Sequence, residues 1–190
     1  MAWHQVRWTE AQQVAALMGV GEDGMPAPGI APDQYHRALR EGGDRLGAAS
    51  FIGHALPRYE ALAWAARILE QEAGTRTLSR GDRQALDHAL RWLGEPNDLT
   101  RRAALDAAEA AGEASPERML ATGVFFSGGS ISEPDLPSVS PAPELAGRFA
   151  GIAVTLAAAR TGDGEALLDR ALDLGERVAA DGMRALGVTS

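Results

Sequence analysis

The segment PRYEALAWAARILEQEAG, residues 57–74, has the strongest helix pattern in the chain. Its apolar residues recur at helical spacing, so one face of the helix can be buried against neighbouring elements. Pro57 suits the first position of a helix, and Gly74 is a natural C-terminal stop. The inward-facing set is Ala61, Trp64, Ala65, Ile68 and Leu69. We therefore predict a core helix here, with Trp64 in or near the core.

The same pattern continues on both sides of this segment. Ser79 and Ser115 read as helix caps, and apolar stripes follow each of them. Gly147 and Gly151 stand four residues apart in a very apolar segment, which lets a neighbouring helix approach closely. We find no convincing strand. Successive helix pairs could also suggest a solenoid, but their lengths share no single period.

We predict an all-α fold, a single-domain bundle of about seven or eight helices over residues 1–190. Residues 1–43 form an N-terminal extension of short helices around a Gly/Pro loop, and residues 127–143 form a long proline-rich extended strap. The core should be mostly Ala, Leu and Val, because aromatic residues make up only 5% of the chain.

Composition excludes several classes of function. The net charge is −8, and all 18 basic residues are arginine and lie scattered, so no basic stripe for nucleic acid is expected. The absence of cysteine removes disulfides, thiol catalysis and cysteine-ligated metal sites. No apolar run is long enough for membrane insertion, and residues 1–10 lack a signal-peptide pattern, so a cytoplasmic location is expected.

His54, Arg58 and Glu60 are the nearest approach to a catalytic cluster. His and Glu could act as general acid and base, and Arg58 could hold an anion. Pro57 separates His54 from Glu60, so the two side chains need not share a face. The simpler interpretation is a helix corner, with His54 bonded to backbone and the two charged side chains in a solvated first turn.

The sequence offers no cofactor or metal motif. No histidine pair has the i, i+4 spacing of zinc enzymes, so no metal site is expected. The only glycine-rich candidate for phosphate is Ser127, Gly128, Gly129 and Ser130. A P-loop needs a lysine, which this chain lacks, and a dinucleotide fingerprint needs a preceding strand. A turn after a helix is the favoured interpretation.

The stretch SEPDLPSVSPAP, residues 132–143, favours extended backbone because a proline recurs every few residues. One interpretation is a structural strap, in which Ile131, Leu136 and Val139 pack across the helices. The other is a recognition segment for a partner protein. The strap is the favoured interpretation, although loops of this length are often functional.

Three segments resemble an uncharacterised bacterial family, known as a domain of unknown function. They are FIGHALPRYEALAWAARIL, RRAALDAAEAAG and FFSGGSISEPDLPSVSPAPELAGRFAGIAVTLAA. They match the family's HALPRxEAxxWA and SGGSxxxPxLPxVxPxP signatures between about residues 51 and 160. The resemblance implies an all-helical protein loosely associated with secretion loci, and it supplies no catalytic residues.

The expected function is therefore protein–protein interaction, as an accessory, adaptor or chaperone-like protein of a bacterial system such as type VI secretion. The expected partner is another protein, and the sequence leaves the oligomeric state open. The alternative is a small-ligand-binding protein or enzyme with a site near His54, Arg58 and Glu60. A converging pocket would favour that alternative, and side chains on separate faces would count against it.

Overall fold

The computed structural model describes residues 2–133 and 135–187, and every regular element in these ranges is a helix. In chain order they are α1 (Ala11–Met18), η1 (Glu22–Gly24), α2 (Pro32–Glu41), α3 (Arg45–Ala55), α4 (Arg58–Ala73), α5 (Arg80–Gly94), α6 (Asp98–Glu109), α7 (Pro116–Phe125), α8 (Leu145–Ala159), α9 (Gly164–Asp181) and η2 (Gly182–Leu186). The all-α prediction is confirmed. The described ranges hold nine α-helices, slightly more than the predicted seven or eight.

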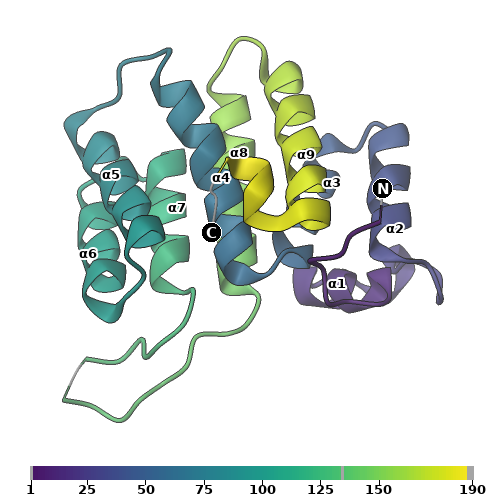
Figure 1. Ribbon diagram of the computed structural model, residues 1–190, viewed down its shortest axis with the longest axis horizontal. Coiled ribbons are helices and arrows are strands. Elements are labelled where there is room, and N and C mark those ends of the chain that lie inside the picture. The colour runs from purple at the N-terminus through teal and green to yellow at the C-terminus, as the bar shows by residue number, and fades with distance from the viewer. Residues whose placement is uncertain (1, 134, 188–190) are drawn as a thin grey trace.

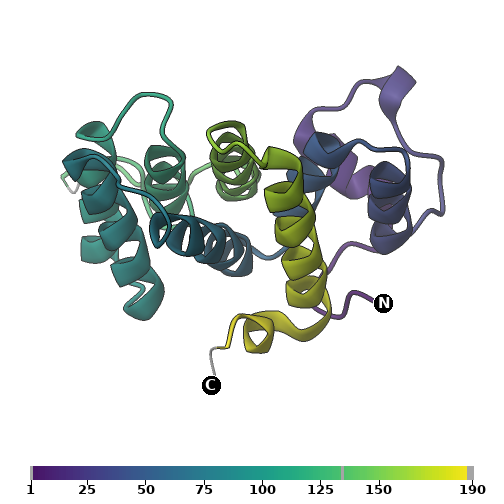
Figure 2. The same ribbon diagram turned by 90° about the horizontal axis from the view of Figure 1, so that it is seen from above.

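The helices form a row rather than a ring (Figures 1 and 2). Helices α5, α6 and α7 pack together at one end, and α4 and α8 occupy the middle. Helix α3 packs against α8 and α9, and it also contacts α1 and α2 at the other end. Helix α8 touches α3, α4, α7 and α9, so its Ala-rich and Gly-rich surface lies at the centre of the molecule.

The predicted caps of α5 and α7 are confirmed, whereas α4 begins one residue later than predicted, at Arg58, with Pro57 as its N-cap. The hydroxyl groups of Ser79 and Ser115 accept hydrogen bonds from the backbone N–H groups three residues later, and so cap α5 and α7. The indole of Trp64 is fully buried on α4 and donates to the carbonyl oxygen of Ala171 on α9 at 2.8 Å. That bond satisfies the one polar atom of a large apolar side chain and ties α4 to α9.

Helices α3 and α8 meet backbone to backbone at Gly53, Gly147 and Gly151. A Cβ atom on Gly147 would lie 2.4 Å from the carbonyl oxygen of Gly53, and one on Gly53 would lie 2.7 Å from that of Gly147. Neither position has space for a side chain. The prediction that Gly147 and Gly151 admit a close neighbour is confirmed, and the neighbour is α3.

A buried ion network joins three helices at the opposite end of α8. The guanidinium of Arg160 lies 2.7 Å from a carboxylate oxygen of Glu72 on α4 and 2.6 Å from one of Glu117 on α7. Glu117 has an exposed fraction of 0%, and each carboxylate receives hydrogen bonds from the same guanidinium. A buried carboxylate needs such a partner, so Arg160 fixes the relative positions of α4, α7 and α8.

A second polar contact joins α2 to α9. Nδ1 of His36 lies 3.3 Å from a carboxylate oxygen of Glu176, which also pairs with Arg40 at 2.8 Å. The ring of His36 is buried beneath Trp3. Burial lowers the pKa of His36 to about 4, against an opposing attraction from Glu176. The imidazole is therefore neutral at pH 7.

Candidate functional site

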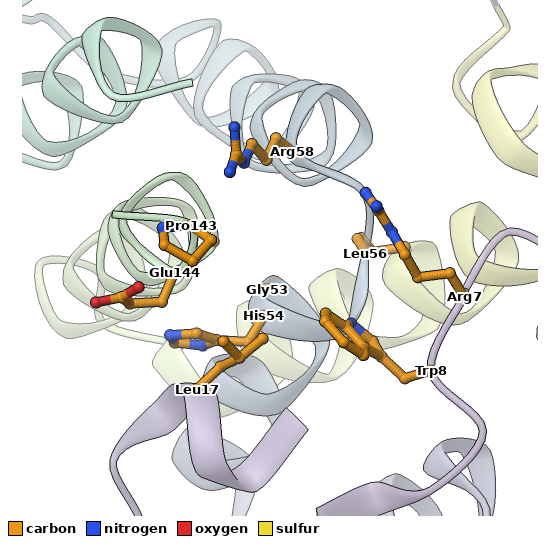
Figure 3. Close-up of a pocket in the computed structure, with 10 residues that line it drawn as sticks. Arg7, Trp8, Leu17, Gly53, His54, Leu56, Arg58, Pro143 and Glu144 are labelled. Atoms are coloured by element: carbon orange, nitrogen blue, oxygen red, sulfur yellow. The ribbon is translucent and has the colours of Figure 1, made fainter. Parts of the chain in front are cut away.

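A small cleft of about 100 Å³ lies where α3, α4, the start of α8 and the N-terminal segment meet. Two of the residues singled out in the sequence, His54 and Arg58, line it (Figure 3). His54 lies in the last turn of α3, and Arg58 begins α4, so the turn at Pro57 brings the two side chains to one cleft. Glu60 does not line it, and the predicted three-residue cluster is incomplete.

His54 is held in a defined tautomer. Its Nδ1 atom lies 2.8 Å from the carbonyl oxygen of Ser50, one turn earlier on α3. A carbonyl oxygen can only accept, so Nδ1 carries a hydrogen and donates it. The side chain is 7% exposed, and within the described ranges Nε2 has no hydrogen-bond partner. Burial lowers the pKa of His54, which leaves Nε2 as a neutral acceptor.

The remaining walls come from distant parts of the sequence. Arg7 and Trp8 reach the cleft from the N-terminal segment, Leu17 from α1, and Glu144 from the residue before α8. Figure 3 shows the ring of His54 and the carboxylate of Glu144 on one side of the space, with Arg7 on the other. Glu144, rather than Glu60, is thus the carboxylate near His54, and its charge acts on that imidazole.

A second candidate feature is the segment between α7 and α8, which projects from the row of helices in Figure 1. Its first residues, Ser127 to Ser130, form the predicted turn, with Gly129 at a positive φ of 67°. Arg58 donates to the carbonyl oxygen of Ser127 at 3.2 Å, so this arginine contacts both the cleft and the turn.

Two arginines of α6 bind the carbonyl oxygens of the same segment. Arg101 is buried and donates to Phe125 at 2.6 Å and to Ser130 at 2.7 Å. Arg102 donates to the carbonyl oxygen of Ser132 at 2.7 Å. Hydrogen bonds from Arg101 and, to a smaller extent, from Arg102 lower the pKa of the Asp98 carboxyl. The ionised carboxylate in turn holds both guanidinium groups in place. The turn thus presents carbonyl oxygens to cations, an arrangement unlike the N–H-lined concavity that a phosphate requires.

The base of the projecting segment is closed by hydrogen bonds. The N–H of Ile131 donates to the carbonyl oxygen of Val139 at 2.9 Å, and the hydroxyl of Ser130 accepts from the N–H groups of Ser132 and Val139. We call residues 131–139 the loop. The loop is thus narrow where it leaves the helices, and its ends are fixed to each other.

The loop does not lie across the helices as the favoured strap interpretation required. Leu136 is 57% exposed and Val139 is 51% exposed, and only Ile131, at the base, is half-buried. The prediction that all three pack on their own helices is wrong. The physical reason is that the bonds between Ser130, Ile131 and Val139 close the loop on itself and direct its tip away from the helices.

Sequence reasoning missed several residues of these two features. Arg7 and Glu144 lie 137 positions apart and carry no motif, and Arg101 and Arg102 read as ordinary charges on an amphipathic helix. Trp8 packs on the core cluster around Phe51. No local signal identifies the others, because their roles depend on how distant helices pack.

The described ranges contain no group of three or more His, Asp or Glu side chains arranged to hold a metal ion. Within the same ranges, every helix is too short or too polar to cross a bilayer.

Comparison with known proteins gives one finding. The model of a family described as "Family of unknown function (DUF6931)" matches residues 35–179. No curated protein and no solved structure matches the chain.

Proposed function

This chain belongs to the family of unknown function DUF6931, and from its geometry we propose that it is a protein-binding module whose contact surface is the loop. The observation that carries the proposal is the exposure of Leu136 and Val139 at the end of a closed, anchored loop. Large apolar side chains exposed at a defined place often mark contact surfaces.

The loop has two properties that favour binding. Its base is held by Arg58, Arg101 and Arg102 through backbone carbonyl groups, so its position relative to the helices is set before a partner arrives. Pro137 restricts the backbone further, because its ring fixes its own φ angle. A segment that is already ordered loses less entropy on binding, and this raises affinity for a given contact area.

The role that fits such a module is that of an accessory, adaptor or chaperone-like protein. We place it in a bacterial, cytoplasmic setting such as type VI secretion, on the strength of the family resemblance and its association with secretion loci. The acidic net charge of −8 and the scattered arginines favour a protein partner over nucleic acid.

The test compares two single substitutions that each place an aspartate on an exposed leucine. Leu136→Asp changes the loop, and Leu99→Asp changes a control position on α6 that is 78% exposed. Each protein is crosslinked in cells of its native host, and the captured proteins are quantified by mass spectrometry. We expect one partner to be captured by the wild type and by Leu99→Asp but reduced at least about tenfold with Leu136→Asp, because losing a central interface contact costs about 2 kcal/mol or more. Equal capture by all three proteins would refute the role of the loop.

The alternative of a ligand-binding protein or enzyme rests on the cleft. His54 and Arg58 do converge there, but Glu60 does not join them, so the proposed acid–base pair of His54 and Glu60 is absent from the cleft.

A further inference from the structure

A groove of about 450 Å³ between α4, α9 and η2 is lined by three arginines, although the chain as a whole carries a net charge of −8. They are Arg67 from α4 and Arg170 and Arg177 from α9. Arg170 and Arg177 stand seven residues apart, so they lie on one face of α9 about 10 Å from each other along the helix. Both are exposed. We call this surface the arginine groove; α4 and α9, which form its walls, lie side by side in Figures 1 and 2.

The carboxylates in the middle of α9 do not neutralise this groove, because arginines of α2 and α3 hold them. The pairs are Asp169 with Arg45, and Asp173 and Glu176 with Arg40. Arg170 and Arg177 take part in no ion pair within residues 2–133 and 135–187. The two guanidinium groups therefore favour a negatively charged occupant.

An apolar surface adjoins the arginine groove. A hollow of about 260 Å³ shares Arg67 and Leu186 with it, and its other walls include Tyr59, Leu90 and Leu93. The two surfaces together can receive a segment that carries carboxylates beside a large apolar side chain. Such a segment must also project from its own molecule in order to reach between the helices.

The loop has this combination of properties. Glu133 and Asp135 are exposed and make no ion pair with any residue that the structure describes, and Leu136 is 57% exposed. The N–H of Leu136 donates to the carbonyl oxygen of Glu133 at 3.0 Å, so the three side chains belong to one tight turn. The loop projects away from α9, so its tip does not lie in the groove of its own chain (Figure 1).

We propose that the loop of one copy of this chain binds in the arginine groove of a second copy. The carboxylates of Glu133 and Asp135 meet Arg170 and Arg177, and Leu136 contacts the adjoining apolar hollow. The loop and the groove lie on different parts of the molecule, so the contact is head to tail and builds rings or open chains of copies. This inference rests on the proposed function of the loop, and it names the partner.

The contact is expected to be weak between two isolated copies. One loop in one groove buries a small area, and two chains that each carry a charge of −8 repel each other at long range. Attraction must therefore come from the local match of charge and apolar surface, which reversal of the local charges can test directly.

The first measurement is sedimentation velocity of the purified full chain over a wide range of concentration. We expect the average mass to rise with concentration, with half of the chain associated at a concentration between about 10 µM and 1 mM. A chain that remains monomeric up to about 2 mM would overturn the inference.

The second measurement exchanges the charges of the two surfaces. One variant carries Glu133→Arg and Asp135→Arg in the loop, and the other carries Arg170→Glu and Arg177→Glu in the groove. Each variant alone should associate at least about tenfold more weakly than the wild type, because like charges then face each other. An equal mixture of the two should associate as the wild type does, since each loop then finds a groove of opposite charge. Recovery in the mixture also excludes misfolding as the cause of the loss, and a mixture that stays monomeric would overturn the inference.

The control is Arg37→Glu with Arg83→Glu, which makes the same change of charge at two exposed arginines outside the groove. It should associate within about threefold of the wild type, because exposed charges elsewhere contribute little. Association that persists unchanged in the loop variant would overturn the inference, since another surface would then join the copies. A chain that stays monomeric while Leu136→Asp still loses a captured partner in cells would overturn self-association and leave the role of the loop standing.

Discussion

Replacing Gly147 by alanine tests the close contact between α3 and α8. The added methyl carbon would lie 2.4 Å from the carbonyl oxygen of Gly53 and 3.0 Å from the Cα atom of His54. The first distance is about 1 Å shorter than the 3.4 Å at which ordinary van der Waals contact begins. The obstructing atoms belong to the backbone of α3, which cannot rotate away as a side chain could. The two helices must therefore separate.

The net effect is the difference between two terms. In an unhindered helix interior, alanine is favoured over glycine by about 1 kcal/mol. Overpacking a filled core costs about 1–3 kcal/mol, and a backbone clash belongs at or above the upper end of that range. We expect Gly147→Ala to lower the free energy of unfolding by about 2 kcal/mol. For a chain of this size, that corresponds to a fall in Tm of roughly 4–8 °C.

The assay is urea denaturation followed by far-ultraviolet circular dichroism, with thermal unfolding as a second readout. Gly94→Ala is the matched control, because a Cβ atom there meets nothing within 4 Å. It should leave stability unchanged or raise it by about 0.4–1 kcal/mol. If Gly147→Ala were as stable as the wild type, α3 and α8 would have to lie further apart than described, and the argument from close packing would be wrong.

Two further predictions concern buried charge. Arg160→Met should lower the free energy of unfolding by about 3–5 kcal/mol in urea denaturation, because Glu117 would keep a buried charge without its partner. The control Arg67→Met breaks an exposed ion pair and should lower it by no more than about 1 kcal/mol. Equal losses of stability in the two variants would contradict the role of Arg160. The pKa of His36 is about 4 in the folded chain and 6.5 in the unfolded chain, so the unfolded state binds the extra proton and stability falls as the pH drops from 6.5 to 4. The free energy of unfolding should fall by about 3 kcal/mol over this range. Measured by urea denaturation between pH 7 and 4, the stability of His36→Gln should depend less on pH than that of the wild type. If the stabilities of the two proteins fell in parallel, His36 would not be the source of the pH dependence.

Much of the fold was readable in the sequence because helix signals are local. The helix at residues 57–74, the caps Ser79 and Ser115 and the turn at Ser127 to Ser130 each depend on residues within a few positions of one another. The pairing of Gly147 with a close neighbour also followed, because only a missing side chain permits such an approach. The identity of that neighbour, Gly53, did not follow.

The candidate sites were predicted only in part. Pairing His54 with Glu60 was a guess from sequence proximity, and the structure places Glu144 beside the imidazole instead. The strap interpretation assumed that apolar side chains seek the core. It failed because Ser130 and its neighbours close the loop with hydrogen bonds, which no hydrophobic pattern reveals.

The sequence by itself determined that this chain is helical, where most helices begin and end, and that no P-loop, dinucleotide or cysteine chemistry is available. The tertiary structure alone decided that Arg7, His54, Arg58 and Glu144 share a cleft, that Arg101 anchors the loop, and that Arg160 compensates two buried carboxylates. The reason is the range of the interactions involved. Helix periodicity and capping act within three or four residues, whereas these contacts join residues that only the packing of whole helices brings together.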